Sequence, residues 1–330
     1  MHKLPLVSFV LISYNQEDFI ESAIQAALAQ DYHPLQVIIS DDCSTDSTWK
    51  KIQTAVQDYH GTHEILLNRN AHNLGIARHV DFICRVATGE FVIFAPADDI
   101  SYKNRTKTLV TAWLHAAPRP TLIHSNFRKV TSNGDVVGLG YDPRLPRSFT
   151  QHANPYAQSL EISGATTAFE RKIYSDFDTI KDNIFAEDAI TFHRAHLLNG
   201  ILYIPNILLD YRVHEKGTSQ KNSKGLNNYL NIFHRFIPEQ TARLSQYRRD
   251  IAQISPSNSG ELLSAVYRKE ERIQLISQIL QGSILESFSS LLNSLFRESE
   301  KKFKKEILKL FIFRWLAACL RFRSHSKNRI

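Results

Sequence analysis

The chain has 330 residues, of which 43% are hydrophobic and 22% are charged, so it can bury a sizeable core as an ordinary globular protein. Its three cysteines, Cys43, Cys84 and Cys319, lie far apart with no paired spacing, which argues against a disulfide framework or a zinc site and suits a reducing cytoplasm. The net charge of +7 comes from residues 301–330, with ten Lys or Arg and one Glu, and the slightly acidic remainder predicts no nucleic-acid-binding surface.

Short apolar runs alternate with helical patterns along the first 130 residues. The runs, which are rich in Val and Ile, are LVSFVLIS (6–13), LQVIIS (35–40), HEILLN (63–68), EFVIFA (90–95) and TLIHSN (121–126). Helical patterns, with apolar residues spaced at three and four, lie between them at 16–30, 45–58, 74–87 and 102–116. This alternation predicts an α/β fold, a Rossmann-like and mostly parallel sheet with helices on both faces. Such sheets bind ligands beyond the carboxyl ends of their strands.

The first apolar run is interpreted as a buried strand, because it lacks a small-residue cleavage site and continues into the polar helix start NQEDFIES. Further strand patterns lie at VVGLG (136–140) and ILYIP (201–205), and from about residue 225 only helical patterns remain. We therefore expect an α/β domain over residues 1–222 and a helical C-terminal region over 223–330. No run reaches the ~18 apolar residues that a membrane-spanning helix needs.

The loop after the first predicted strand contains no glycine, since Gly61 is the first glycine of the chain. Dinucleotide-binding fingerprints and P-loops need glycines at this position so that the backbone can approach phosphate. Here the position holds SYNQ (13–16). Both kinds of phosphate-binding loop are therefore excluded.

Paired carboxylates follow two of the predicted strands. Asp41 and Asp42 end the second strand, and Asp98 and Asp99 follow the fourth. Helix caps and turns are the local alternative for both pairs, but adjacent charges at the end of a buried strand cost stability unless they are used. Oxygen ligands at this density suit a hard divalent cation, Mn²⁺ or Mg²⁺, shared with a diphosphate.

The sequence resembles the family 2 glycosyltransferases, which have the A-type glycosyltransferase fold, over roughly residues 5–220. The segments that carry the resemblance are VSFVLISYNQEDFI, SDDCSTDST, NLGIARHV, GEFVIFAPADD, ISGATTAFERKIY, AEDAITFHRAHLLNG and YRVHEKGTS. Each segment is a weak signal alone, but seven of them in the family's order make a strong one.

This resemblance implies roles for residues in the first half of the chain. Tyr14 and Asp42 would contact the nucleotide base, with the Asp42 carboxylate accepting a hydrogen bond from a uracil-type N–H. Arg78 would lie near the nucleotide and offset phosphate charge. Asp98 would face the ribose or the metal, and Asp99 would ligate the metal.

In the second half, Asp188 of the Glu187–Asp188 pair matches the position of the family's general base. Tyr211, Arg212 and His214 match a motif near the diphosphate and the acceptor. On local evidence, Glu187 can equally cap a helix or pair locally, and His214 is evenly open between a ligand contact and a structural role.

One departure from the family concerns the metal site. Many relatives have a further Asp where this chain has Pro96, so the division of labour between Asp98 and Asp99 stays open.

Two other features of the sequence favour structural roles. His193 and His196 fit surface or packing positions, because two helical histidines three residues apart lack a third ligand. The lone Gly164 fits a close backbone approach.

The implied reaction is an inverting transfer of a sugar from a nucleotide-diphosphate sugar, most often UDP-linked in this family, to an acceptor hydroxyl. A divalent cation stabilises the leaving diphosphate, so no protein acid is needed. One carboxylate takes the proton of the acceptor hydroxyl, and a single displacement inverts the anomeric centre. By analogy with bacterial relatives, the acceptor is a lipid-linked or nascent cell-surface polysaccharide.

Residues 301–327 mix Lys and Arg with Phe, Leu, Ile and Trp315. This pattern predicts a cationic amphipathic helix that lies on an anionic membrane surface, and the alternative is a helix packed on protein with a solvated basic face. The expected location is cytoplasmic, peripheral on the inner face of the cytoplasmic membrane.

Two other classes of protein are weighed against the transferase. An inactive nucleotide-sugar-binding or scaffold protein of the same fold is opposed by the retained Asp42, Asp98, Asp99 and Asp188. A sugar nucleotidyltransferase is disfavoured by the glycine-free first loop.

Overall fold

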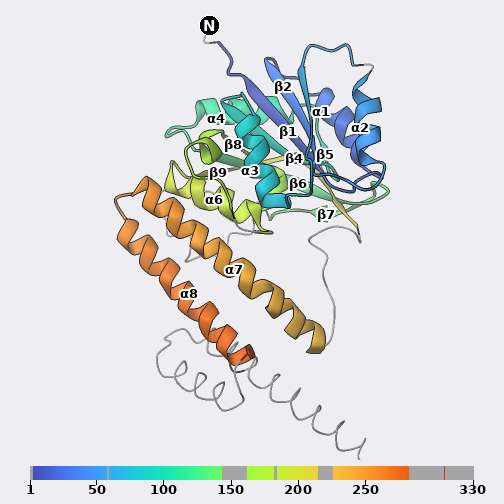
Figure 1. The fold of residues 1–330 in the computed structure, drawn as a ribbon. Coiled ribbons are helices and arrows are strands. Elements are labelled where there is room, and N and C mark those ends of the chain that lie inside the picture. The colour runs from blue at the N-terminus through green and yellow to red at the C-terminus, as the bar shows by residue number, and fades with distance from the viewer. Residues whose placement is uncertain are drawn as a thin grey trace, which may run out of the picture. The chain divides into compact units, whose positions relative to one another are not determined.

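The computed structural model describes residues 3–57, 59–142, 162–181, 184–214, 226–281 and 308 (Figure 1). The described residues form one sheet of nine strands, in the order β3-β2-β1-β4-β8-β6-β9-β5, with β7 paired to β6. The first strands are β1 Val7–Ser13, β2 Leu35–Asp41, β3 Glu64–Arg69, β4 Phe91–Pro96 and β5 Ile100–Ser101. The others are β6 Leu122–Thr131, β7 Val136–Leu139, β8 Thr167–Glu170 and β9 Ile201–Val213.

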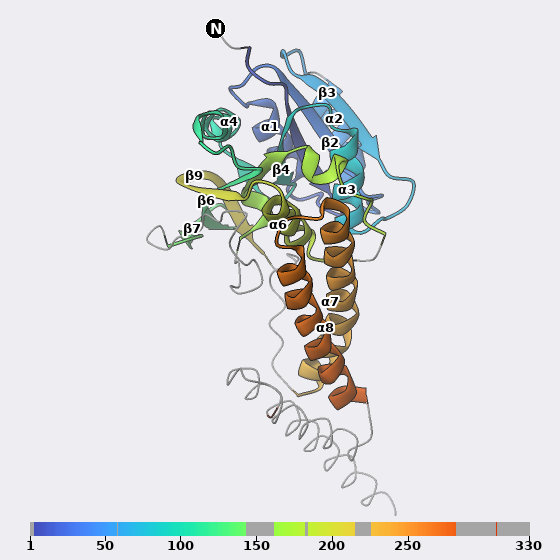
Figure 2. The same ribbon diagram turned by 90° about the vertical axis from the view of Figure 1, so that its left-hand side faces the viewer.

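Helices cover this sheet on both faces, as predicted. They are α1 Ile20–Leu28, α2 Thr48–Gln57, α3 Ile76–Val86, α4 Arg105–His115, the 3₁₀ turn η1 Gly164–Thr166, α5 Lys172–Ser175 and α6 Glu187–Leu197. Side chains of α1, α2 and α4 share one core with alternate residues of β1, β2 and β4, while α3, α5 and α6 contact one another on the other face (Figure 2). Because both faces are covered, every residue of β1 and β2 is buried. This explains why these strands are continuous apolar runs.

The sheet contains both parallel and antiparallel pairs, and β6 and β9 form a further parallel pair in its second half. Strands β3, β2, β1 and β4 are parallel neighbours, whereas β8 is antiparallel to both β4 and β6. The expected mostly parallel sheet is therefore mixed. Strand β8 has only four residues, TAFE, and such a short segment gives no recognisable period in the sequence.

The chain divides into two compact units, each described by itself. One consists of residues 1–220 with 249–257, and the other of 221–248 with 258–330. Helices α7 Leu226–Ile254 and α8 Ser259–Gln281 follow the sheet domain in the chain. In the described part of the chain, no helix is long and apolar enough to cross a membrane. The predicted basic tail lies outside the described residues, apart from Leu308.

Candidate active site

Four strands end at one edge of the sheet. Strands β1, β2 and β4 run in the same direction. Two antiparallel steps, β4 to β8 and β8 to β6, restore that direction in β6, and β9 is parallel to β6. The segments that follow β1, β2, β4 and β9 carry most of the residues that the resemblance singles out, and the fold brings them to this common edge.

The loops after β1 and β2 are bound to each other by side chains. The Asn15 N–H donates to Ser44 Oγ (2.8 Å), and the Thr45 N–H donates to Asn15 Oδ1 (2.9 Å). Further along, the Ser47 N–H donates to Glu17 Oε2 (3.0 Å). Asn15 itself adopts the left-handed conformation, with φ of 52°, which asparagine tolerates better than most residues. Side chains thus occupy backbone N–H groups that a glycine-rich loop would offer to phosphate.

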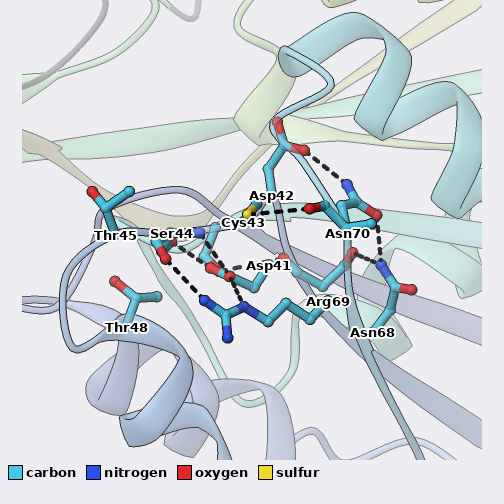
Figure 3. Close-up of polar contacts among 12 residues, drawn as sticks. Asp41, Asp42, Cys43, Ser44, Thr45, Thr48, Asn68, Arg69 and Asn70 are labelled. Carbon is cyan, nitrogen blue, oxygen red and sulfur yellow. Dashed lines mark hydrogen bonds and ion pairs between the residues drawn. The ribbon is translucent and has the colours of Figure 1, made fainter.

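Asp41, the last residue of β2, adds further contacts to these loops (Figure 3). Its fully buried carboxylate accepts hydrogen bonds from the Ser44 N–H (2.9 Å), the Ser44 hydroxyl and the Ser13 hydroxyl (3.3 Å). Arg69 lies 3.5 Å away from it. These contacts join β1, β2, β3 and the loop after β2, so Asp41 has a structural role.

Asp42, the neighbouring acid, points to a different loop (Figure 3). Its Oδ1 accepts from Asn70 Nδ2 (2.8 Å) and the Leu74 N–H (2.9 Å), and its Oδ2 accepts from the Gly75 N–H (3.0 Å). These three hydrogen bonds hold the Asp42 carboxylate, which is 2% exposed, against the loop that follows β3. Tyr14, which follows β1, is 45% exposed.

A buried polar chain, which the sequence analysis missed, supports Asp42. Asn68 Nδ2 donates both to Asn70 Oδ1 (3.0 Å) and to Ser40 Oγ (2.9 Å). Ser40 Oγ lies 2.6 Å from Nε2 of the buried His79, and burial lowers the pKa of His79. Because Asn70 must accept through Oδ1, its amide nitrogen faces Asp42. Arg78, which is predicted to offset phosphate charge, donates to the carbonyl of Leu74 (2.7 Å).

The end of β9 contacts the acidic pair after β4. His214 Nε2 lies 3.2 Å from Asp98 Oδ2, and the Asp98 side chain is 23% exposed. The Arg212 N–H donates to Asp99 Oδ1 (2.9 Å), and the Arg212 guanidinium donates to the Asp98 carbonyl (3.1 Å). That guanidinium also lies over the Phe19 ring at 5.1 Å. Asp98, Asp99, Arg212 and His214 therefore form one cluster.

The two acids of this cluster differ in environment. Asp99 is 5% exposed, and its Oδ2 is buried with no hydrogen-bond partner among the described residues. Burial, and then the charge of Asp98, raises the pKa of Asp99 well above its ordinary value. In the described part of the chain, no group of three or more His, Cys, Asp or Glu is placed to hold a metal ion. A cation here would need ligands from a substrate, as Mg²⁺ commonly takes from phosphates.

The second acidic pair begins helix α6. Glu187 and Asp188 line a small pocket together with Val80, Phe94, Gly164, Thr167, Phe169, Thr191 and Phe192. Burial and the charge of Asp188 raise the pKa of Glu187 to about 8. The Asp188 Oδ1 accepts from the Ala189 N–H (2.7 Å). Because Phe94 belongs to β4, this pocket adjoins the strand that leads to Asp98.

The remaining predicted residues serve packing. His193 and His196 are both buried in α6, which agrees with the packing role rather than the surface one. Tyr211, from the family motif, packs on Phe127 at a centroid distance of 5.3 Å. A buried residue that the sequence analysis did not single out, Arg105, donates to the carbonyls of Phe94 (2.8 Å) and Ala165 (2.7 Å).

A helix-covered mixed sheet with acidic residues after its strands is the arrangement of the A-type glycosyltransferases. The chain belongs to Glycosyl transferase family 2, whose family model matches residues 8–177. It is 24% identical over 241 residues, 72% of this chain and 89% of the other, to the Escherichia coli "UDP-Glc:alpha-D-GlcNAc-diphosphoundecaprenol beta-1,3-glucosyltransferase WfgD".

Two solved structures are similar in fold. S. aureus TarS 1–349 in complex with UDP-GlcNAc has a TM-score of 0.54 at 16% identity, covering 89% of this chain and 92% of that one. The mannosyltransferase PcManGT from Pyrobaculum calidifontis, in complex with GDP-Man and Mn²⁺, has a TM-score of 0.52 at 16% identity, covering 96% and 87%. These likenesses establish the fold of the chain.

Proposed function

We propose that this protein is a metal-dependent, inverting hexosyltransferase that uses a UDP-sugar and glycosylates a hydroxyl of a lipid-linked or nascent cell-surface polysaccharide. The observation that carries the proposal is the placement of two acidic pairs around β4. Asp98 and Asp99 follow the strand, and Glu187 and Asp188 share a pocket with Phe94 within it. Transfer from a diphosphate needs charge stabilisation on one side of the sugar and a base on the other.

The nucleotide is assigned to the edge formed by Tyr14 and Asp42. The exposed Tyr14 ring offers a stacking surface, and the resemblance to family 2 glycosyltransferases assigns Asp42, in the loop beside it, to a base with a ring N–H, such as uracil. WfgD is named for UDP-Glc, and TarS was solved in complex with UDP-GlcNAc, which supports UDP as the nucleotide. Arg78, which contacts the Leu74 carbonyl, and Arg212, which contacts the Asp98 carbonyl, are assigned to offset phosphate charge.

The side chains at the ends of β4 and β9 fit as ligands of a divalent cation that is bound jointly with a diphosphate. Asp98 and His214 would hold it, because the Asp98 carboxylate is the more exposed of its pair and lies against the His214 ring. When bound, such a cation stabilises the negative charge of the leaving diphosphate. Asp99 would supply a further ligand, because its buried Oδ2 has no hydrogen-bond partner among the described residues while its Oδ1 accepts from the Arg212 N–H. The Mn²⁺ in the PcManGT complex is consistent with a metal in this fold.

The general base is assigned to Asp188. Burial and the neighbouring Asp188 raise the pKa of Glu187 to about 8, which favours the protonated acid at Glu187 and makes it the weaker candidate for the base. Pairs of acids whose pKa values are pushed apart commonly divide acid and base roles in this way. Asp188 would take the proton of the acceptor hydroxyl, and a single displacement would invert the anomeric centre.

The membrane part of the proposal rests on sequence alone, because residues 301–330 lie outside the described residues, apart from Leu308. Their ten Lys or Arg against one Glu would favour an anionic surface that carries lipid-linked acceptors, at ~1 kcal/mol per charge. Full-length protein should co-sediment with anionic liposomes, less so as salt rises, and a variant without residues 301–330 should not. Equal binding by both forms would contradict this part.

The central test combines binding with turnover. UDP-, GDP- and dTDP-sugars are screened by thermal shift with and without Mn²⁺, since a ligand that binds only the folded state raises the melting temperature. Release of nucleoside diphosphate is then measured with lipid-diphosphate acceptors. We expect a metal-dependent shift with a UDP-sugar and turnover that EDTA abolishes. Normal turnover in EDTA would refute the metal role, and binding without release across the acceptors would favour the alternative, an inactive nucleotide-sugar-binding protein.

A further inference from the structure

The 3₁₀ turn η1 lies directly against the acidic pair of α6. A Cβ atom added to Gly164 would stand 3.0 Å from Glu187 Oε1 and 3.2 Å from Asp188 Cβ. Phe94 would be the next neighbour, at 3.8 Å. The backbone of this turn and the two carboxylate side chains are therefore in close contact, with no room for a side chain between them.

Space, and not backbone conformation, is what requires a glycine here. Gly164 has no left-handed φ, in contrast to Gly75 (φ of 78°) and Gly200 (φ of 84°). An L-residue can adopt the backbone of the turn. Its Cβ, however, would meet Glu187 and Asp188 at distances tighter than ordinary van der Waals contact.

The turn is anchored by hydrogen bonds from residues outside α6. Arg105 is 1% exposed and donates to the carbonyls of Ala165 (2.7 Å) and Phe94 (2.8 Å). The Thr167 hydroxyl donates to the Gly164 carbonyl (2.7 Å). Because these hydrogen bonds tie the turn to β4 and β8, an added side chain would be accommodated by movement of the α6 carboxylates rather than of the turn.

We propose that Gly164 is a positioning residue for the Glu187–Asp188 pair, and that the Arg105-anchored turn is the wall that sets the distance of this pair from β4. The inference rests on the proposed role of Asp188 as general base. Displacement of reacting groups by less than 1 Å lowers rates strongly, and about 10²-fold per ångström is a guide. A shift of a few tenths of an ångström should therefore be measurable in kcat.

The test compares Gly164→Ala with Gly260→Ala, whose added Cβ would meet nothing within 4 Å. We expect Gly164→Ala to lower kcat about tenfold, to leave the dissociation constant of the UDP-sugar within about twofold, and to shift the pH dependence of kcat. Gly260→Ala should match the wild type. A purely structural effect would lower the melting temperature without changing the pH profile.

Shortening Glu187 should relieve the contact. In Gly164→Ala/Glu187→Asp, one methylene is removed where one methyl is added, so the double variant should lose less activity than the product of the two single losses. If Gly164→Ala does not fold, Thr167→Val takes its place. It removes the hydroxyl that holds the Gly164 carbonyl and should lower kcat several-fold without changing donor affinity.

Asp188→Asn is measured alongside, so that the two hypotheses can fail separately. Normal turnover in Asp188→Asn would refute the base assignment itself. An inactive Asp188→Asn together with a Gly164→Ala enzyme indistinguishable from Gly260→Ala would overturn the positioning role alone. Strict additivity in the double variant would overturn it as well.

Discussion

Two pairs of adjacent acidic residues have opposite surroundings in this protein. Asp41 and Asp42, at the end of β2, receive hydrogen bonds from side chains and backbone N–H groups of several loops. Glu187 and Asp188, at the start of α6, line an apolar pocket in which burial and mutual repulsion raise the pKa of Glu187 to about 8. The first pair fixes loops through hydrogen bonds, and in the second pair Glu187 holds its proton more tightly than an ordinary glutamate.

The difference shows that a pair of adjacent acidic residues in a sequence does not by itself indicate one kind of function. Donors around a carboxylate favour its charged form, and an apolar wall beside a second carboxylate disfavours it. The first arrangement makes a rigid frame for a ligand, whereas the second makes a group that can exchange a proton. Each prediction below separates these two functions, from the largest effect to the smallest.

Replacing Asp188, the proposed base, should remove turnover without disturbing the loops around Asp41 and Asp42. Asp188→Asn is expected to lower kcat by about 10² or more, the range for loss of a general base, with UDP-sugar affinity nearly unchanged. Steady-state kinetics and thermal shift measure the two quantities. Glu187→Gln resembles the protonated acid and should be milder at neutral pH; the reverse order of losses would move the base role to Glu187.

Replacing Asp41 should lower the stability of the fold and leave turnover nearly unchanged. Asp41→Asn is expected to lower the free energy of unfolding by roughly 2 kcal/mol, the scale of hydrogen bonds to a buried charge, because one of the two acceptor oxygens and the charge that faces Arg69 are lost. Turnover per folded molecule should change little. Denaturant unfolding provides the measurement, with the exposed Asp135→Asn as control. An Asp41→Asn protein of normal stability would contradict the structural role.

The exposed ring at the donor edge should affect binding alone. Tyr14→Ala is expected to weaken UDP-sugar binding by up to about tenfold, since an aromatic contact contributes ~0.5–1.5 kcal/mol. Stability should be unchanged because the side chain is 45% exposed. Calorimetric titration measures the affinity, and Tyr14→Phe, which keeps the ring, should bind like the wild type. Unaltered affinity in Tyr14→Ala would remove the ring from the nucleotide site.

The proton on Glu187 should be visible in stability. Its pKa of about 8 in the folded state lies above the ordinary 4.5, so the folded protein holds an extra proton between these values. This contribution to stability is present below about pH 4.5 and is lost as the pH rises through about 8. The melting temperature of the wild type relative to Glu187→Gln should therefore fall across this window, at about 2–4 °C per kcal/mol. A constant difference would refute the raised pKa.

Much of the sheet could be predicted from the sequence, because β1, β2 and β4 are buried and are continuous apolar runs. The later strands were harder to predict. The predicted run at 121–126 continues to Thr131 and the one at 201–205 to Val213, since polar residues there find partners across the sheet. Asp210, for example, pairs with Arg128 at 2.7 Å. Such pairing depends on tertiary structure and leaves no apolar pattern.

Site residues at strand ends could be anticipated in the same way, since each acid follows an apolar run. What could not be anticipated is how neighbouring acids divide their roles. Asp98 contacts His214, whereas Asp99 contacts the Arg212 backbone, and both partners come from a strand more than 100 residues later. Arg105 lies in an ordinary helical pattern, and only the fold shows that it anchors η1.

The mutual hydrogen bonding of the loops after β1 and β2 has a consequence for changing the donor of such an enzyme. Asn15 and Glu17 of one loop bind backbone N–H groups of Thr45 and Ser47 in the other. A loop transplanted alone from a relative would leave these N–H groups without their acceptors. Grafting should therefore succeed only when both loops move together, and libraries that vary one loop at a time would miss productive combinations.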